Sequence, residues 1–293
     1  MSIFRAGLPR TYGGDHLSEF EKLKVVTKYE LLKQFRRKRF YGALAITVLA
    51  VVLIIGLYQG LDLPKQMGIP DQVLNQWGPE LFAIFVTSMG ALAVLAAVFF
   101  AGDAIASEFE SKTGYILFPN PVKRTTIVVG KYLACFIATA AIIIIAYLIS
   151  AGALLVFYGQ VPVGIIGSLA LTLILACSMI SLAFAFSSIL KGGMGATIAT
   201  LLTYMVFFTI ISSSLAYAGY DPWFMPDRAG DAVASTYGLP LEQLVGGFGF
   251  GGPMMGGMMR ASQDPTLSFF VSLAYAVVLF GISILVTKRR EMI

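Results

Sequence analysis

Six apolar stretches, each long enough to cross a bilayer as a helix, constrain this chain more than any other feature. A transmembrane helix needs about 20 consecutive apolar residues. Because polar backbone groups inside lipid must find partners within their own segment, such stretches fold as helices. The sequence therefore predicts an all-α polytopic membrane protein whose transmembrane domain covers residues 39–293. The expected spans are residues 41–59, 81–101, 132–158, 163–190, 194–217 and 267–287.

The basic residues set the expected orientation of these spans. With the N-terminus inside, eighteen of the 21 Lys and Arg residues lie on the cytoplasmic side, and only Lys65, Arg228 and Arg260 lie outside. Basic residues accumulate on the cytoplasmic side, so we predict a multi-pass protein of the cell membrane with both termini in the cytoplasm. The net charge of +5 does not point to nucleic acid, because the basic residues mark helix ends, where they suit anionic lipid headgroups.

The residues before the first span divide into two parts. Residues 1–17 contain Gly and Pro at several positions, which predicts a flexible cytoplasmic tail. Residues 18–38 are typical of an amphipathic helix, with Val25, Tyr29 and Leu32 on one face. We predict that this helix lies in the cytoplasmic interface with its apolar face in lipid. A solvated helix that leads into the first span is the alternative.

The six predicted spans contain no Asp, Glu, Lys, Arg or His. Proton relays and ion pathways depend on ionisable residues at membrane depth, and an intramembrane protease needs a nucleophile beside a base or paired carboxylates. The chain also lacks a phosphate loop, because Thr125 stands where the motif that ends in Gly130-Lys131 requires a glycine. We therefore predict a chain with no catalytic residue and no bound cofactor, driven by energy from another subunit.

The stretch with the most specific pattern is residues 102–131, GDAIASEFESKTGYILFPNPVKRTTIVVGK, on the inside between the second and third spans. Glu108 and Glu110 precede Lys112, and an apolar patch at residues 115–118 is followed by two prolines. This order predicts a short cytoplasmic helix with acidic positions, held with its apolar patch against the inner membrane face. An ordinary amphipathic loop with solvated charges is the alternative.

Individual positions of this loop carry a family resemblance. They are Asp103, Ile105, Ala106, Glu108, Glu110, Thr113, Pro121, Val122, Arg124, Gly130 and Lys131. At this spacing they resemble the signature of ABC-2 type exporter permeases. The Thr-Gly-Tyr and Asn-Pro-Val runs are similar to those of the permease for nitrous-oxide-reductase maturation and of archaeal multidrug-type permeases. Gly114 departs from the family pattern, in which an aliphatic residue often follows the threonine.

The resemblance implies a coupling helix that docks into a groove of a separate cytoplasmic ABC ATPase. It implies that Glu108 and Glu110 contact the ATPase, and that Arg124 and Lys131 fix the loop to its own membrane base. The predicted coupling site comprises Asp103, Glu108, Glu110, Thr113, Pro121, Arg124 and Lys131. The resemblance further implies an interfacial elbow helix before six spans, and a second permease copy, identical or paralogous. Spans one and five would form the seam, and two ATPase subunits would bind ATP and Mg²⁺.

Residues 218–266 form the largest segment predicted to lie outside. It includes the run VGGFGFGGPMMGGMMR, with Met254, Met255, Met258 and Met259. Thioethers are soft ligands that suit Cu(I), so a copper site is one interpretation of the four methionines. Methionine is also a flexible apolar side chain, and we favour a re-entrant or interfacial element packed through its glycines.

The sequence thus predicts the non-catalytic permease subunit of an ATP-driven ABC-2 exporter, surrounded by membrane lipids. Two other classes remain open. An ATP-independent carrier or channel would transport cargo without any ATPase. A membrane scaffold would recruit a cytoplasmic enzyme through the same loop without moving cargo.

Overall fold

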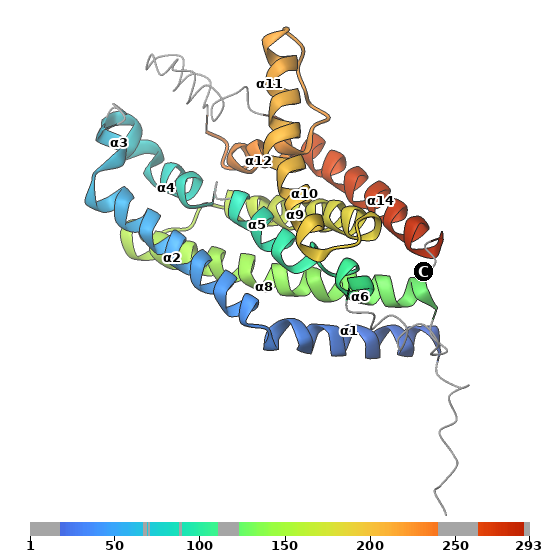
Figure 1. Cartoon of the computed structure of the whole chain (residues 1–293). Helices are drawn as coiled ribbons and strands as arrows, with labels where there is room; N and C mark the ends of the chain where they lie inside the picture. The colour runs from blue at the N-terminus through green and yellow to red at the C-terminus, as the bar shows by residue number, and fades with distance from the viewer. Residues whose placement is uncertain are drawn as a thin grey trace, which may run out of the picture.

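The computed structural model describes residues 18–66, 69, 71–87, 90–110, 123–239 and 263–289. Within these ranges the regular structure is helical throughout (Figure 1). Five of the helices are long and apolar enough to cross a membrane. They are α2 (Lys38–Gly60), α8 (Arg124–Tyr158), α9 (Gly164–Ile189), the continuous helix Gly193–Tyr217, and α14 (Pro265–Arg289). The predicted all-α polytopic membrane fold is confirmed, while the count of six spans stays a prediction.

The segment predicted as the second span, residues 81–101, is divided between two helices. These are α4 (Asp71–Thr87) and α5 (Gly90–Ala101), and the two residues between them lie outside the described ranges. Helix α4 is itself kinked at Trp77, whose φ of −126° and ψ of 19° are not helical. Pro79 follows closely, and a proline removes one helical hydrogen bond and displaces the preceding turn. Neither piece reaches the length of the five spanning helices.

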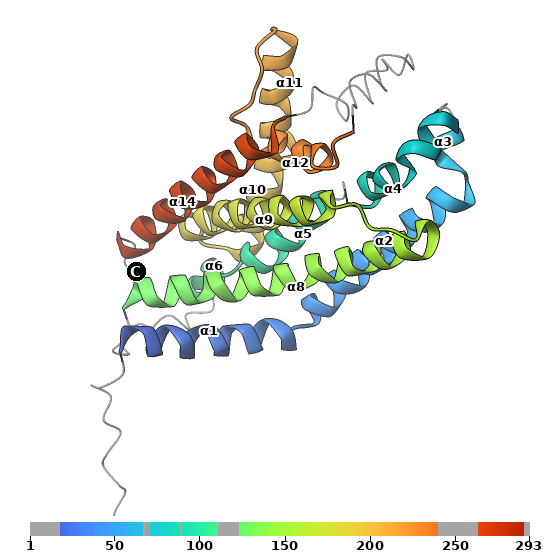
Figure 2. The ribbon, with the colours of Figure 1, turned by 180° about the vertical axis from the view of Figure 1, so that it is seen from behind.

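Helices α9 and α14 form the most extensive contact between two elements of the structure (Figure 2). The buried residues of α14 are mostly small, and small side chains let two helix backbones approach closely in a membrane. We call the end of the molecule that carries the N-terminal helix the inner end (Figure 1). Near it, the Ser283 hydroxyl of α14 donates to the carbonyl of Phe184 on α9, at 3.1 Å. The two helices therefore form one tightly packed pair. The buried positions of α14 are Ser268, Val271, Ser272, Ala276, Ser283 and Thr287.

The helix that we predicted as span five has three parts. Helix α10 (Gly193–Leu202) is followed by a π-helical turn at Thr203–Phe208 and by α11 (Thr209–Tyr217). A π-helical turn interrupts the regular packing of a helix and often occurs at functional sites. The α10 part packs against α9 and α5, whereas α11 projects away from the other spans (Figure 1).

Helix α1 (Glu19–Arg36) lies along the inner end of α8 (Figure 1). It starts with a capping box, in which the Ser18 hydroxyl accepts from the Glu21 amide and the Glu21 carboxylate accepts from the Ser18 amide. A Cβ added at Gly130 of α8 would lie 2.7 Å from Val26 of α1. Glycine at this position of the family signature therefore permits the close approach of the two helices.

The opposite face of α1 is exposed and partly apolar. Val25, Tyr29 and Leu32 have exposed fractions of 46%, 68% and 44%. The 35 residues of α8 span about 52 Å at 1.5 Å per residue, which exceeds the roughly 30 Å hydrocarbon core. Part of α8 therefore extends beyond the hydrocarbon, and α1 packs beside the end of α8 that begins at Arg124.

Candidate functional site

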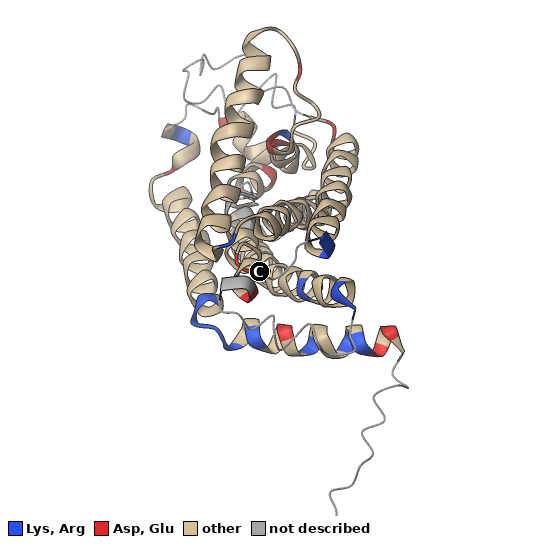
Figure 3. Ribbon diagram, turned by 45° about the vertical axis from the view of Figure 1, so that its right-hand side comes forward, with Lys and Arg blue, Asp and Glu red and all other residues tan. Residues whose placement is uncertain are grey.

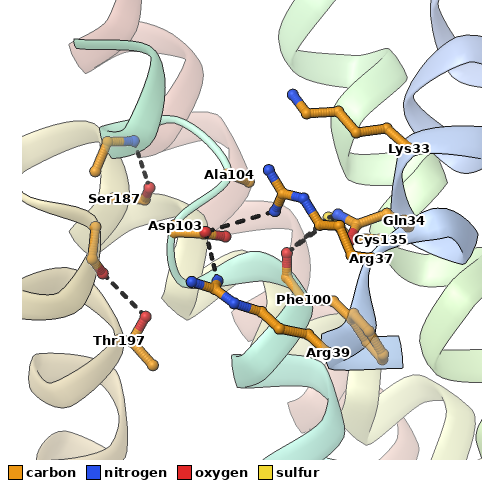
Figure 4. A network of polar contacts seen from close by, with 12 residues as sticks. Lys33, Gln34, Arg37, Arg39, Phe100, Asp103, Ala104, Cys135, Ser187 and Thr197 are labelled. Atoms are coloured by element: carbon orange, nitrogen blue, oxygen red, sulfur yellow. Dashed lines mark hydrogen bonds and ion pairs between the residues drawn. The ribbon is translucent and has the colours of Figure 1, made fainter. Parts of the chain in front are cut away.

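Residues 102–108 leave the inner end of α5 and enter the short helix α6 (Ala106–Glu110). We call residues 102–108 the coupling segment. Contacts in this region come from α1, α8, α9 and α10, four elements that are remote in sequence (Figure 4). The coupling segment is therefore the place where the inner ends of several spans meet.

Lys131 of α8 is the centre of a buried ionic network, since only 5% of its side chain is exposed. Its Nζ lies 2.7 Å from Glu108 Oε1 of the coupling segment and 3.1 Å from Glu30 Oε1 of α1. It also donates to the Ala104 carbonyl at 3.2 Å. Lys33 of α1 lies 3.6 Å from the same Glu108 oxygen. Because a buried charge is tolerated only when it is paired and hydrogen-bonded, these two lysines and two carboxylates hold three elements in a fixed arrangement.

Asp103 is the second ionic contact of the coupling segment. Its Oδ2 lies 2.6 Å from Arg39 Nη1 and 3.5 Å from Arg37 Nη1. Arg37 has extended backbone between α1 and α2, so this pair of arginines marks the junction of the two helices (Figure 4). Asp103 therefore links the coupling segment to the point at which α1 becomes the first span.

The last turn of α5 is also fixed by neutral hydrogen bonds. The Phe100 carbonyl accepts from Gln34 Nε2 of α1 at 3.4 Å and from the Cys135 thiol of α8 at 3.2 Å. Carbonyls near a helix end lack hydrogen-bond donors within the helix. Here the side chains of two neighbouring helices supply the donors. Cys135 and Cys177 are free thiols, and Cys135 acts here as a weak donor.

Two further contacts hold the coupling segment against α9 and α10. Ser187 Oγ of α9 accepts the backbone N–H of Ile105 at 3.0 Å and that of Ala106 at 2.8 Å. A Cβ added at Gly102 would overlap the Thr197 side chain of α10 and lie 2.9 Å from its Cα. A glycine is therefore required where the segment passes the start of the fifth span.

Comparison with protein families agrees with this geometry. The family model described as ABC-2 family transporter protein matches residues 25–292. The chain belongs to the ABC-2 transporter family. It is thus the membrane permease of an ABC transporter, an integral membrane protein that works with a partner ATPase subunit. No curated protein matches the chain.

The permease brings together part of the coupling site predicted from the sequence. Asp103, Glu108 and Lys131 lie in or against the coupling segment, and Arg124 is the first residue of α8. Glu110 ends α6, but its side chain lies outside the described residues. Thr113 and Pro121 lie wholly outside them, as do the four methionines considered for Cu(I), which are Met254, Met255, Met258 and Met259.

Glu108, for which the resemblance implies a contact with the ATPase, is buried in this structure. Its residue is 7% exposed, and its carboxylate faces Lys131 instead of solvent. In this structure the side chain belongs to the internal base of the coupling segment, and a contact of Glu108 with an ATPase stays a prediction. The physical reason is that the α8 lysine, which is itself buried, needs a carboxylate partner.

Sequence reasoning did not identify several residues of the site. Glu30 and Gln34 lie four residues apart on α1, so they share one helical face, opposite Val25 and Leu32, and Arg37 directly follows the end of that helix. The sequence signal for Glu30 and Gln34 was a polar stripe on the face of the helix opposite its apolar residues. The partners of Arg39 and Ser187 in the coupling segment are 64 and 82 residues away in the sequence. No local pattern could therefore identify these two residues.

Proposed function

We propose that this permease belongs to an ATP-driven exporter and transmits ATPase motion through its coupling segment. The observation that carries the proposal is the buried network of Lys131, Glu108 and Glu30. A loop that receives a mechanical displacement must be joined stiffly to the spans that it moves. Removing one partner of a buried ion pair costs about 3–5 kcal/mol, so the network keeps the segment joined to α1 and α8 during that displacement.

In this mechanism the ATP and Mg²⁺ are bound by the partner, and the permease contributes no catalytic residue. ATP binding closes a pair of ATPase subunits, which displaces the 102–131 loops. Glu110 and the residues after it contact the ATPase, whereas Asp103, Glu108 and Lys131 hold the loop to its base. The displacement passes into spans two and three, and the seam between permease copies opens outward.

The exposed apolar faces of two helices support a second permease copy. On α2, Leu49 is 66% exposed, and on the fifth span Phe207 and Ile210 are 60% and 58% exposed. Gly195 of the fifth span has no neighbouring atom where a Cβ would stand, and Ala199 follows one turn later. Small residues at this spacing favour close helix approach. We therefore place the seam on α2 and the fifth span, with an identical or a paralogous partner copy.

The distribution of charge supports cytoplasmic termini in the cell membrane. Figure 3 shows Lys and Arg along α1 and at the ends of helices near the C-terminus. The site that we assign to ATPase coupling lies at this same end of the molecule. Because basic residues are retained on the cytoplasmic side, this end faces the compartment that contains ATP.

The direct test is purification of the tagged permease from its native cells in a mild detergent, followed by mass spectrometry and an ATPase assay. We expect a phosphate-loop ATPase in about one copy per permease, with activity that vanadate inhibits. Glu110→Lys should weaken this recovery, and Lys28→Glu, a charge reversal at an exposed position of α1, is the matched control. Repeated recovery of the permease alone would contradict the proposal and favour an ATP-independent carrier.

A further inference from the structure

The contact between the coupling segment and α9 has an unusual chemistry. Ser187 is fully buried, and its single hydroxyl oxygen accepts two consecutive backbone N–H groups, those of Ile105 and Ala106. Both donors lie where α5 has ended and α6 begins, so they have no carbonyl of a preceding helical turn. Buried N–H groups must find an acceptor, and the acceptor here belongs to a different span.

Other buried serines of α9 behave differently. Ser178 donates to the Leu175 carbonyl at 2.7 Å, which is a bond to the helix's own backbone and the ordinary behaviour of serine inside a helix. Ser181 donates to the Cys177 carbonyl at 3.0 Å and also contacts the Tyr132 hydroxyl of α8 at 3.2 Å. Ser187 therefore differs from its neighbours in joining α9 to the coupling segment.

The position of Ser187 connects the segment to more than one span. Phe184 lies one turn before Ser187, and its carbonyl accepts from Ser283 of α14. Since α9 and α14 have the most extensive contact in the structure, a force applied at Ser187 acts on both helices together.

The contact with α10 has a different mechanical character. Gly102 meets Thr197 through close packing, and packing resists compression but not separation. The two hydrogen bonds to Ser187 resist displacement in both directions. The α9 contact is therefore the one able to carry a motion and its reversal.

We propose that Ser187 is a positioning residue that carries displacement of the coupling segment into the α9–α14 pair. The motion then reaches spans four and six directly, in addition to spans two and three. This inference rests on the proposed function, because an ATPase must supply the displacement.

Hydrogen–deuterium exchange of the full permease–ATPase complex tests this inference. Exchange is compared between the nucleotide-free complex and the complex trapped with ATP, Mg²⁺ and vanadate. In the wild type we expect trapping to change deuterium uptake at the inner ends of α8, α9 and α14. In Ser187→Ala we expect the change in α9 and α14 to fall by at least about half, while that in α8 remains. Ser178→Ala, an equally buried serine of the same helix, should match the wild type.

The outcomes separate this inference from the proposed function. Unchanged responses of α9 and α14 in Ser187→Ala would overturn the inference, as would a wild type in which α8 responds and α9 and α14 do not. No response anywhere in the wild type would overturn the proposed function as well. If the alanine variant does not assemble, Ser187→Cys replaces it, because a thiol is a weak acceptor of similar size. The same selective loss is expected there, and Ser187→Thr, which keeps the hydroxyl, should restore the response.

Discussion

The inner and outer ends of this permease are built differently. At the inner end, ionic and neutral contacts join α1, the coupling segment, α8 and α9 around the buried Lys131. At the outer end, α11 contacts the short helix α12 (Pro226–Ser235) through the Ser212 hydroxyl, which donates to Asp227 Oδ1 at 2.7 Å. Much of α11 is exposed, including Tyr217 at 97%.

This difference indicates how the two ends would contribute to transport. A closely connected inner end moves as a unit, so a displacement of the coupling segment is not lost in local distortion. At the outer end, α11 changes its arrangement at small cost, because its contacts outside its own span are mainly with α12, whereas α12 itself packs against α9 and α14. The π-helical turn at Thr203–Phe208 separates the packed α10 from the projecting α11. The boundary between the closely packed and the loosely packed part of the molecule therefore lies inside the fifth span.

The largest effect is expected for Lys131→Met. This change leaves Glu30 and Glu108 with only the more exposed Lys33 near them, and loss of one partner of a buried pair destabilises by about 3–5 kcal/mol. Thermal unfolding of the purified permease in detergent measures the loss as a lower Tm. Lys65→Met, at an exposed position in helix α3 (Leu63–Gln66), is the control. A Tm equal to that of the control would show that the network does not stabilise the inner end.

A smaller effect is expected for Asp103→Asn, which removes the carboxylate that faces Arg37 and Arg39. Arg39 is 59% exposed, and solvent screens exposed pairs, so we expect a loss of only about 0.5–1 kcal/mol. The effect should shrink further at 0.5 M salt, where surface ion pairs are screened. Measurement of Tm at low and high salt checks this. A loss of stability as large as that of Lys131→Met would contradict the view that Lys131 contributes more than Asp103 to holding the coupling segment.

The smallest global effect is expected for Ser212→Ala at the outer end. The lost hydrogen bond is partly buried, and its net contribution is about 1 kcal/mol or less. Its local effect should be larger, since it joins α11 to α12. Hydrogen exchange in α11 should become faster while exchange in α1 stays the same. Ser235→Ala, which removes hydrogen bonds of α12 to the Ala232 and Gln263 carbonyls but none to α11, is the comparison. Faster exchange in α1 would show that the two ends are not independent.

Apolar length and turn residues predicted much of the fold. The predicted span 132–158 lies within α8, and the predicted span 163–190 agrees with α9 to within one residue at each end. Gly159, which ends α8 with φ of 68°, supplies the left-handed residue that a helix C-terminus favours. The kink in α4 had a readable signal in Pro79. The π-helical turn had none, because no proline, glycine or charged residue occurs at residues 203–208.

The candidate site was predictable in location but not in detail. The spacing of acidic residues after the second span identified the loop, yet the same spacing cannot distinguish an outward from an inward carboxylate. Glu108 faces inward because Lys131, 23 residues later, is buried beside it. Burial of this kind depends on how α1 packs against α8, and packing between separate helices leaves no local pattern. The tie to Ser187 was hidden for the same reason.

The most direct test of the central claim measures whether the buried network couples the inner end to the outer end. Spin labels at Val163→Cys and Tyr217→Cys, both highly exposed, report the distance between the outer end of α8–α9 and that of α11. The variant is the neutral double substitution Lys131→Gln with Glu108→Gln, which keeps hydrogen-bonding groups and volume while removing the ion pair. In the complex with wild-type coupling residues, trapping with ATP and vanadate should shift this distance. In the neutral variant the ATPase should still hydrolyse ATP, but the distance should not shift. An equal shift in both would contradict the account.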